Sequence, residues 1–169
     1  MKKHNGMRPQ DVVILLKIAA KAKNSWRMKD IASELGISAS EVSESFNRNV
    51  LAGLLNSDKQ QLMKSALLEF LQHGLKYVFP QKPGALVRGM PTAHAAPPLR
   101  QLIQSDELYV WQWAKGKIRG QNVEPLHPSV PEACLRDAKL YELLALTDAL
   151  RLGRVREQKL AIEELEKRI

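Results

Sequence analysis

Residues 28–55 constrain the fold of this chain most strongly, because they predict two short helices joined by one tight turn. The first helix has apolar residues at helical spacing, namely Ile31, Ala32 and Leu35. Gly36 then ends it by adopting the left-handed conformation that a Cβ disfavours. Ser38 and Glu41 have the spacing of a capping box, in which each side chain satisfies a backbone N–H at the helix start. The second helix is expected over about residues 40–52, with an apolar face formed by Val42, Phe46 and Val50.

These features resemble the helix-turn-helix of winged helix-turn-helix (MarR-like) bacterial transcriptional regulators. The residues that carry the resemblance are Ile31, Ala32, Leu35, Gly36, Ile37 and Val42. The family usually places an aliphatic residue where this chain has Ser45, and here Phe46 takes over that packing role. The resemblance implies that the second helix enters the major groove of double-stranded DNA. Because the same motif also serves contacts between proteins, it predicts the fold more specifically than the function.

Transferred residue by residue, the resemblance gives two sets of candidate DNA contacts. The side chains expected to read base edges are Ser38, Ser40, Ser43, Glu44 and Asn47. The basic side chains expected to hold phosphates are Arg27, Lys29, Arg48, Lys82 and Arg88. Asn can pair with adenine and Glu can accept from cytosine, as a helix in the major groove requires. The competing interpretation is a plain solvated helix face, and its glutamates count against DNA because they repel phosphate.

The formal net charge of +8 and the pI near 9.7 suggest a polyanionic partner, and the charge is unevenly distributed. Residues 1–60 hold ten Lys/Arg against six Asp/Glu, and residues 61–125 hold eight against four. Residues 126–169 hold eight of each, so the whole basic excess precedes residue 126. This favours phosphate contacts by the first part of the chain and protein contacts by the last part. A protein of high pI without a nucleic-acid partner is the competing interpretation.

Two later segments predict β-structure. Residues 75–79 and 85–88 flank a Pro/Gly-rich breaker and form a basic, hairpin-like segment after a helix expected over 62–73. We interpret this segment either as a wing that touches the sugar-phosphate backbone or as a surface loop. Residues 107–123 alternate apolar and polar side chains and predict a second hairpin. We expect its aromatic row to cover a core rather than to stack unpaired bases, and that row consists of Tyr109, Trp111 and Trp113.

The C-terminal part predicts two helices, over about 137–152 and 154–169. Asp137 is a good N-cap for the first helix, and Gly153 separates the two. The second helix has a short heptad-like apolar stripe made of Val155, Ile162, Leu165 and Ile169. We expect this stripe to form the seam of a homodimer or to bind a partner protein. The alternative is that it docks on its own chain.

Nothing in the sequence predicts catalysis, a cofactor or a metal ion. The chain has no phosphate loop, dinucleotide fingerprint or zinc-peptidase motif. The one cysteine, Cys134, has no partner at metal-ligand spacing, and the histidines are scattered at His4, His73, His94 and His127. A single cysteine is typical of a reducing compartment, and neither a signal peptide nor a membrane span is evident. We therefore expect a cytoplasmic protein without membrane contact.

These observations predict a mainly α-helical chain with small β-hairpins. A winged helix-turn-helix-like domain is expected over residues 7–95, an extended segment and β-hairpin over 96–125, and a helical C-terminal segment over 126–169. The first helix is expected from Pro9 to about Ala22. The predicted function is sequence-specific binding of double-stranded DNA by a homodimeric transcriptional regulator. The alternative is an antitoxin or adaptor whose C-terminal helices bind a partner protein.

Overall fold

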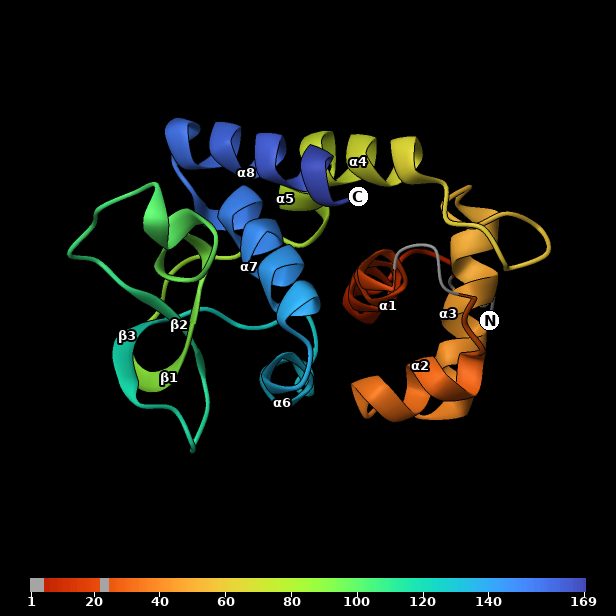
Figure 1. Cartoon of the computed structure of the whole chain (residues 1–169), viewed down its shortest axis with the longest axis horizontal. Coiled ribbons are helices and arrows are strands. Elements are labelled where there is room, and N and C mark those ends of the chain that lie inside the picture. Colours follow the sequence, from red (N-terminus) through yellow and green to blue (C-terminus); the bar gives the residue numbers. More distant parts are fainter. Residues whose placement is uncertain (1–4, 22–24) are drawn as a thin grey trace.

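A central helix, α7 (Ala138–Leu152), runs through the middle of the molecule and packs against elements on both sides of it. The computed structural model describes residues 5–21 and 25–169, with eight α-helices and three β-strands in that part of the chain. Figure 1 shows a small β-barrel to the left of α7 and the first three helices to its right. The protein is therefore mainly helical with one small sheet, as the sequence predicts in outline.

Three N-terminal helices form the right-hand part of the molecule in Figure 1, namely α1 (Pro9–Ala20), α2 (Met28–Leu35) and α3 (Ala39–Leu51). Most of α1 is buried on every face, because it lies between α3 and α7. Gly36 ends α2 with a φ of 68°, and Ser38 Oγ at the start of α3 accepts the backbone N–H of Glu41 at 3.2 Å. The predicted turn and the Ser38 cap are confirmed, whereas the Glu41 carboxylate accepts from the Ser38 hydroxyl rather than from a backbone N–H. His4 and the predicted end of the first helix at Ala22 lie outside the described residues.

After α3 the chain forms α4 (Lys64–His73) and the short helix α5 (Leu75–Val78). The helix expected over 62–73 is confirmed. Of the hairpin-like segment, the first arm at residues 75–79 is wrong because it is helical, whereas residues 86–88 of the second arm belong to a strand. Leu75 is fully buried and α5 packs against α7, so this segment gains more apolar contact as a helix than as a solvated strand. The described chain therefore has no wing after α3, and the winged form of the helix-turn-helix is not confirmed.

Three strands close into a small barrel, namely β1 (Leu86–Thr92), β2 (Tyr109–Gln112) and β3 (Ile118–Asn122). β1 pairs antiparallel with both other strands, with Met90 opposite Trp111 and Arg88 opposite Arg119. β2 and β3 are parallel to each other, so the predicted strands exist but do not form the expected antiparallel hairpin. Gly89 lies where all three strands meet, and a Cβ there would overlap the carbonyl group of Trp111. Only glycine allows this approach.

The barrel is attached to α7 by hydrogen bonds to one buried carboxylate. Asp148 of α7 accepts from Trp111 Nε1 at 2.6 Å and from Thr92 Oγ1 at 2.7 Å. Trp111 is 1% exposed, so the core role expected for the aromatic row is confirmed for this residue. Tyr109 and Trp113 are half-buried and pack against the same core. The three aromatic side chains therefore do not form one exposed stacking surface.

Helix α6 (Val130–Leu135) precedes α7, and Asp137 between them joins three helices. Its carboxylate caps α7 by accepting the backbone N–H of Leu140 at 3.0 Å, which confirms the predicted N-cap. It also accepts from the buried Lys17 of α1 at 2.6 Å, and the same ammonium lies 2.7 Å from Glu34 of α2. Burial is the largest single influence on the pKa of Asp137 and raises it. The hydrogen bonds from Lys17 and the Leu140 N–H, together with the charge of Lys17, outweigh burial, so the pKa lies below its ordinary value.

Helix α8 (Val155–Arg168) packs against α7 and α4. Leu165 is 1% exposed, and Ile162 and Ile169 are partly buried against the same core, whereas Val155 is 82% exposed. Leu165 therefore docks on its own chain, as in the alternative interpretation, and Ile162 and Ile169 do so in part. A homodimer or partner seam made by all four residues is not supported, because the core already covers Leu165.

One hydrophobic core extends through all three predicted segments. β1 from residues 7–95 pairs with β2 and β3 from residues 96–125, and α7 from residues 126–169 packs against both α1 and the barrel. The predicted boundaries therefore do not separate units that fold around cores of their own. Within the described ranges, no helix is long and apolar enough to cross a membrane.

Candidate nucleic-acid interface

Helix α3 lies at the end of the molecule opposite the barrel, and Figure 1 shows no described helix or strand beyond it. The packing side of α3 is fixed by its buried residues, which are Val42, Ser45, Phe46, Arg48 and Asn49. The predicted base-reading residues lie mainly on the opposite side: Ser38, Ser40, Glu44 and Asn47 are exposed and Ser43 is half-buried. The structure therefore brings this set together on one accessible helix face.

The first turn of α3 is held by the cap and by the chain before α6. Ser38 Oγ both accepts the N–H of Glu41 and donates to the Glu41 carboxylate at 3.0 Å, so its hydroxyl is already engaged. A Cβ added to Gly36 would lie 3.9 Å from Ser129 Cβ, which places the turn next to the start of α6. Burial lowers the pKa of the nearby His127, and the Glu41 carboxylate partly opposes that shift. The C-terminal half of the chain thus supports the turn.

Asn47 lies on the exposed face of α3 and contacts the loop that follows the helix. Its Oδ1 accepts a hydrogen bond from Lys59 Nζ at 2.6 Å. Lys59 adopts a φ of 59°, and its loop is fixed by Asn56 Oδ1, which accepts the backbone N–H groups of Gln60 and Gln61 at 3.0 and 2.9 Å. The sequence analysis missed Lys59. The turn-forming residues around it predict a turn, but not its contact with α3.

Two of the predicted phosphate contacts lie at the start of α2. Arg27 is exposed and forms an ion pair with Asp30, whose carboxylate is 3.0 Å from Arg27 Nε. Lys29 is also exposed. An exposed ion pair of this kind contributes little to stability, so Arg27 can exchange Asp30 for a phosphate at small cost.

Arg48 contradicts its predicted role as a phosphate contact. Its guanidinium is 9% exposed and donates two hydrogen bonds to the fully buried Asp11 carboxylate of α1, at 2.8 and 2.7 Å. These hydrogen bonds raise the pKa of Arg48. The rotation of α3 explains the error: Ser45 and Asn49 are buried beside Phe46, which turns Arg48 toward α1. Arg48 therefore joins α3 to α1 and is not presented to solvent.

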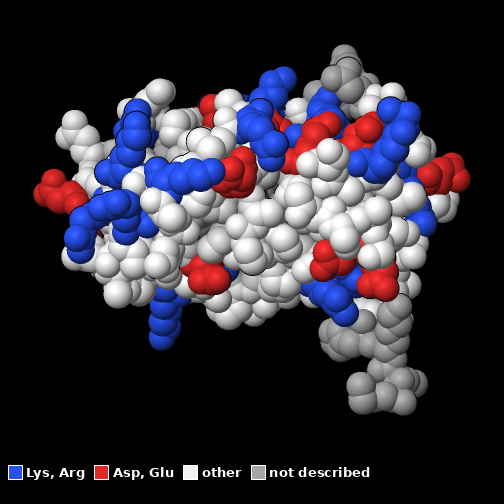
Figure 2. All heavy atoms as spheres, turned by 90° about the horizontal axis from the view of Figure 1, so that it is seen from below, with Lys and Arg blue, Asp and Glu red and all other residues white. Residues whose placement is uncertain are grey.

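Lys82 and Arg88 are exposed, and Arg88 belongs to β1 while Lys82 lies in the segment that leads into β1. Figure 1 shows β1 in the barrel, on the side of the molecule away from α3. Arg88 faces Arg119 across the β1–β3 pair, and Lys117 is exposed on the adjoining turn. Figure 2 shows basic side chains gathered over the barrel on the left, whereas basic and acidic side chains alternate over the helical end on the right. The predicted phosphate residues therefore do not form one surface.

Within the described part of the chain, no group of three or more His, Cys, Asp or Glu side chains has the arrangement of a metal site. Cys134 is buried and burial raises the pKa of its thiol. No protein-family model matches this chain, and no curated protein or solved structure matches it either.

Proposed function

We propose that this protein binds double-stranded DNA sequence-specifically and acts as a transcriptional regulator, with α3 in the major groove. The observation that carries the proposal is the α2–turn–α3 unit. Gly36 and the Ser38 cap set the angle between the helices, and the outer face of α3 is not covered by another described element. Asn47 is the main candidate for base reading, because its amide can pair with adenine. Ser40 and Glu44 lie on the same face.

The charges around α3 support binding that depends on base contacts more than on phosphates. Arg27 and Lys29 of α2 and Lys59 after α3 are available cations, but Glu41 and Glu44 lie on α3 itself. If two to four phosphates are neutralised, log affinity falls with log salt concentration at a slope of about −2 to −4. We include a second copy of the chain in the proposal, because such regulators usually grip two half-sites. We do not assign the apolar stripe of α8 as its seam, because Leu165 is buried in the core of its own chain.

The test is selection of genomic duplex fragments by the full chain, followed by fluorescence anisotropy on the selected site. We expect Asn47→Ala to weaken binding to that site by about 5- to 150-fold, which corresponds to about 1–3 kcal/mol, and to leave binding to random duplex unchanged. Lys29→Ala should weaken both kinds of binding and reduce the salt slope by about one. Gln72→Ala, at an exposed position of α4, is the matched control and should change neither.

Two results would contradict the proposal. The first is a folded chain that enriches no DNA fragment even at low salt. The second is an Asn47→Ala variant that keeps both its fold and its full preference for the selected site.

A further inference from the structure

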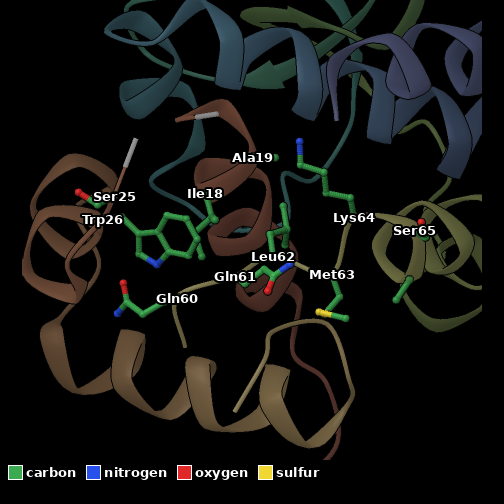
Figure 3. A pocket seen from close by; sticks show the side chains of 11 residues that line it. Ile18, Ala19, Ser25, Trp26, Gln60, Gln61, Leu62, Met63, Lys64 and Ser65 are labelled. Atoms are coloured by element: carbon green, nitrogen blue, oxygen red, sulfur yellow. The ribbon is translucent and has the colours of Figure 1, made fainter. Parts of the chain in front are cut away.

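A pocket of about 780 Å³ lies between the end of α1, the start of α2 and the chain from Gln60 to Ala66. A volume of this size is typical of small-molecule sites. Figure 3 shows side chains from these three segments facing one space, with Ile18 and Trp26 on one side and Leu62 and Met63 on the other. The pocket therefore combines an apolar interior with an opening to solvent.

The indole N–H of Trp26 has no hydrogen-bond partner among the residues that the structure describes. Trp26 is 8% exposed, and its Nε1 is buried without a partner among the described residues. Figure 3 shows this nitrogen turned toward the side of the pocket that carries Gln60. A buried N–H without a partner has lost its hydrogen bond to water, so an acceptor placed in the pocket would recover that loss. The orphan donor thus indicates that the pocket accommodates a ligand.

The polar lining selects the charge of that ligand. Among the described residues, Lys64 is the one charged residue that lines the pocket, and the other polar side chains are neutral, namely Ser25, Gln60, Gln61 and Ser65. Because this described lining includes no carboxylate, its potential favours an anion. The indole N–H and the amides supply donors to oxygen atoms, and the apolar walls suit a hydrocarbon ring or chain. These features fit a small organic anion.

The wall of the pocket is continuous with the candidate DNA-reading face. Gln60 and Gln61 line the pocket, and their backbone N–H groups are held by Asn56. Lys59, the preceding residue, donates to Asn47 on α3 at 2.6 Å. A ligand that moves Gln60 therefore also acts on the Lys59–Asn47 hydrogen bond. This loop is the physical connection between the two sites.

We propose that this pocket binds a small organic anion and that its occupancy changes DNA binding by α3. The second part of the proposal rests on the proposed function, and the first part does not. The probe is 8-anilinonaphthalene-1-sulfonate, whose fluorescence rises in apolar sites and whose sulfonate supplies acceptor oxygens.

The pocket is tested without DNA on the full chain. In ¹⁵N-correlated NMR spectra, the Trp26 indole N–H signal, identified by its loss in Trp26→Phe, should shift on saturation with the probe. The Trp111 signal should stay, because that N–H already donates to Asp148. Lys64→Gln should weaken probe binding by about threefold to fivefold, as expected for one exposed charge, whereas Lys159→Gln on α8 should leave it unchanged. A Trp26 signal that does not shift, or equal weakening of probe binding by both lysine variants, would overturn the proposal that this pocket binds an anion.

The coupling is tested with the selected DNA site. The probe should change the DNA affinity of the wild-type chain at least about threefold, and Lys59→Ala should abolish that change by removing the link to Asn47. If the probe shifts the Trp26 signal and leaves DNA affinity unaltered, the regulatory part is overturned and the pocket stands. If the chain binds no DNA at all, the proposed function fails together with the regulation, and the NMR result still decides the pocket.

Discussion

The strongest prediction concerns Arg48, which the sequence places on DNA and the structure places in the core. In the folded protein its guanidinium donates two hydrogen bonds to Asp11, which is fully buried. Asp11 also accepts the backbone N–H of Arg8 at 2.8 Å at the start of α1. Arg48→Ala leaves the Asp11 carboxylate in the core without a guanidinium and with the neutral Arg8 N–H as a donor.

Removal of one partner of a buried ion pair typically costs about 3–5 kcal/mol, because the remaining charge is desolvated and unpaired. For a chain of this size each kcal/mol lowers Tm by about 2–4 °C, so Arg48→Ala should lower Tm by about 6–20 °C. The double variant Asp11→Ala with Arg48→Met removes both charges and fills part of the space. It should recover part of the loss, but not the cap that Asp11 provides at the start of α1, which is worth about 0.5–2 kcal/mol.

The assay is urea unfolding at pH 7, followed by circular dichroism, on the wild-type chain and the single and double variants. DNA affinity is then measured at a temperature where each variant is folded. An Arg48→Ala variant with wild-type stability and reduced affinity for every duplex would refute the buried pair and restore the phosphate role. A double variant that is less stable than Arg48→Ala would refute the argument that the unpaired carboxylate causes the loss.

Three further predictions concern the fold around the interface. Gly36→Ala should lower the free energy of unfolding by about 1–2 kcal/mol, because the Cβ of alanine disfavours the left-handed φ of 68°. An unchanged midpoint in urea unfolding would contradict this prediction. Leu165→Asp should lower stability by more than about 3 kcal/mol, whereas Val155→Asp should change it by less than about 0.5 kcal/mol; equal effects would contradict the packing of α8. Because the pKa of Asp137 is lowered in the folded state, its contribution is complete above its ordinary pKa and is lost as pH falls through the folded value. Lys17→Met should therefore lose less stability between pH 7 and pH 3 than the wild-type chain, and a larger loss would contradict the pair.

The sequence by itself determined the features that depend on neighbours within one helical turn. The Gly36 turn, the Ser38 cap and the Asp137 cap were predictable, because a left-handed glycine and a side-chain oxygen at a helix start act within three or four residues. The exposed face of α3 followed from the same periodicity, which buries Val42 and Phe46 and leaves Asn47 outside.

Tertiary structure decided which strands pair and what covers each helix face. The residues of β1 carry a strand pattern, but their pairing with two strands more than fifteen residues away depends on closure of the barrel and on Gly89. α5 is helical because α7 covers it, and α7 is formed by residues far along the chain. The same long-range packing buries Leu165, which takes this residue out of the predicted dimer seam.

The same distinction between local and long-range interactions applies to the candidate site. Periodicity selected the residues on the outer face of α3, but the assignment of Arg48 depended on Asp11, 37 residues earlier, which no local pattern connects with it. The pocket at Trp26 likewise needs three separate segments to meet, and its orphan N–H exists only after they do. The residues of one helical turn determine whether a helix cap forms. The partner of a buried charge or donor depends instead on which distant group the fold brings within hydrogen-bond distance.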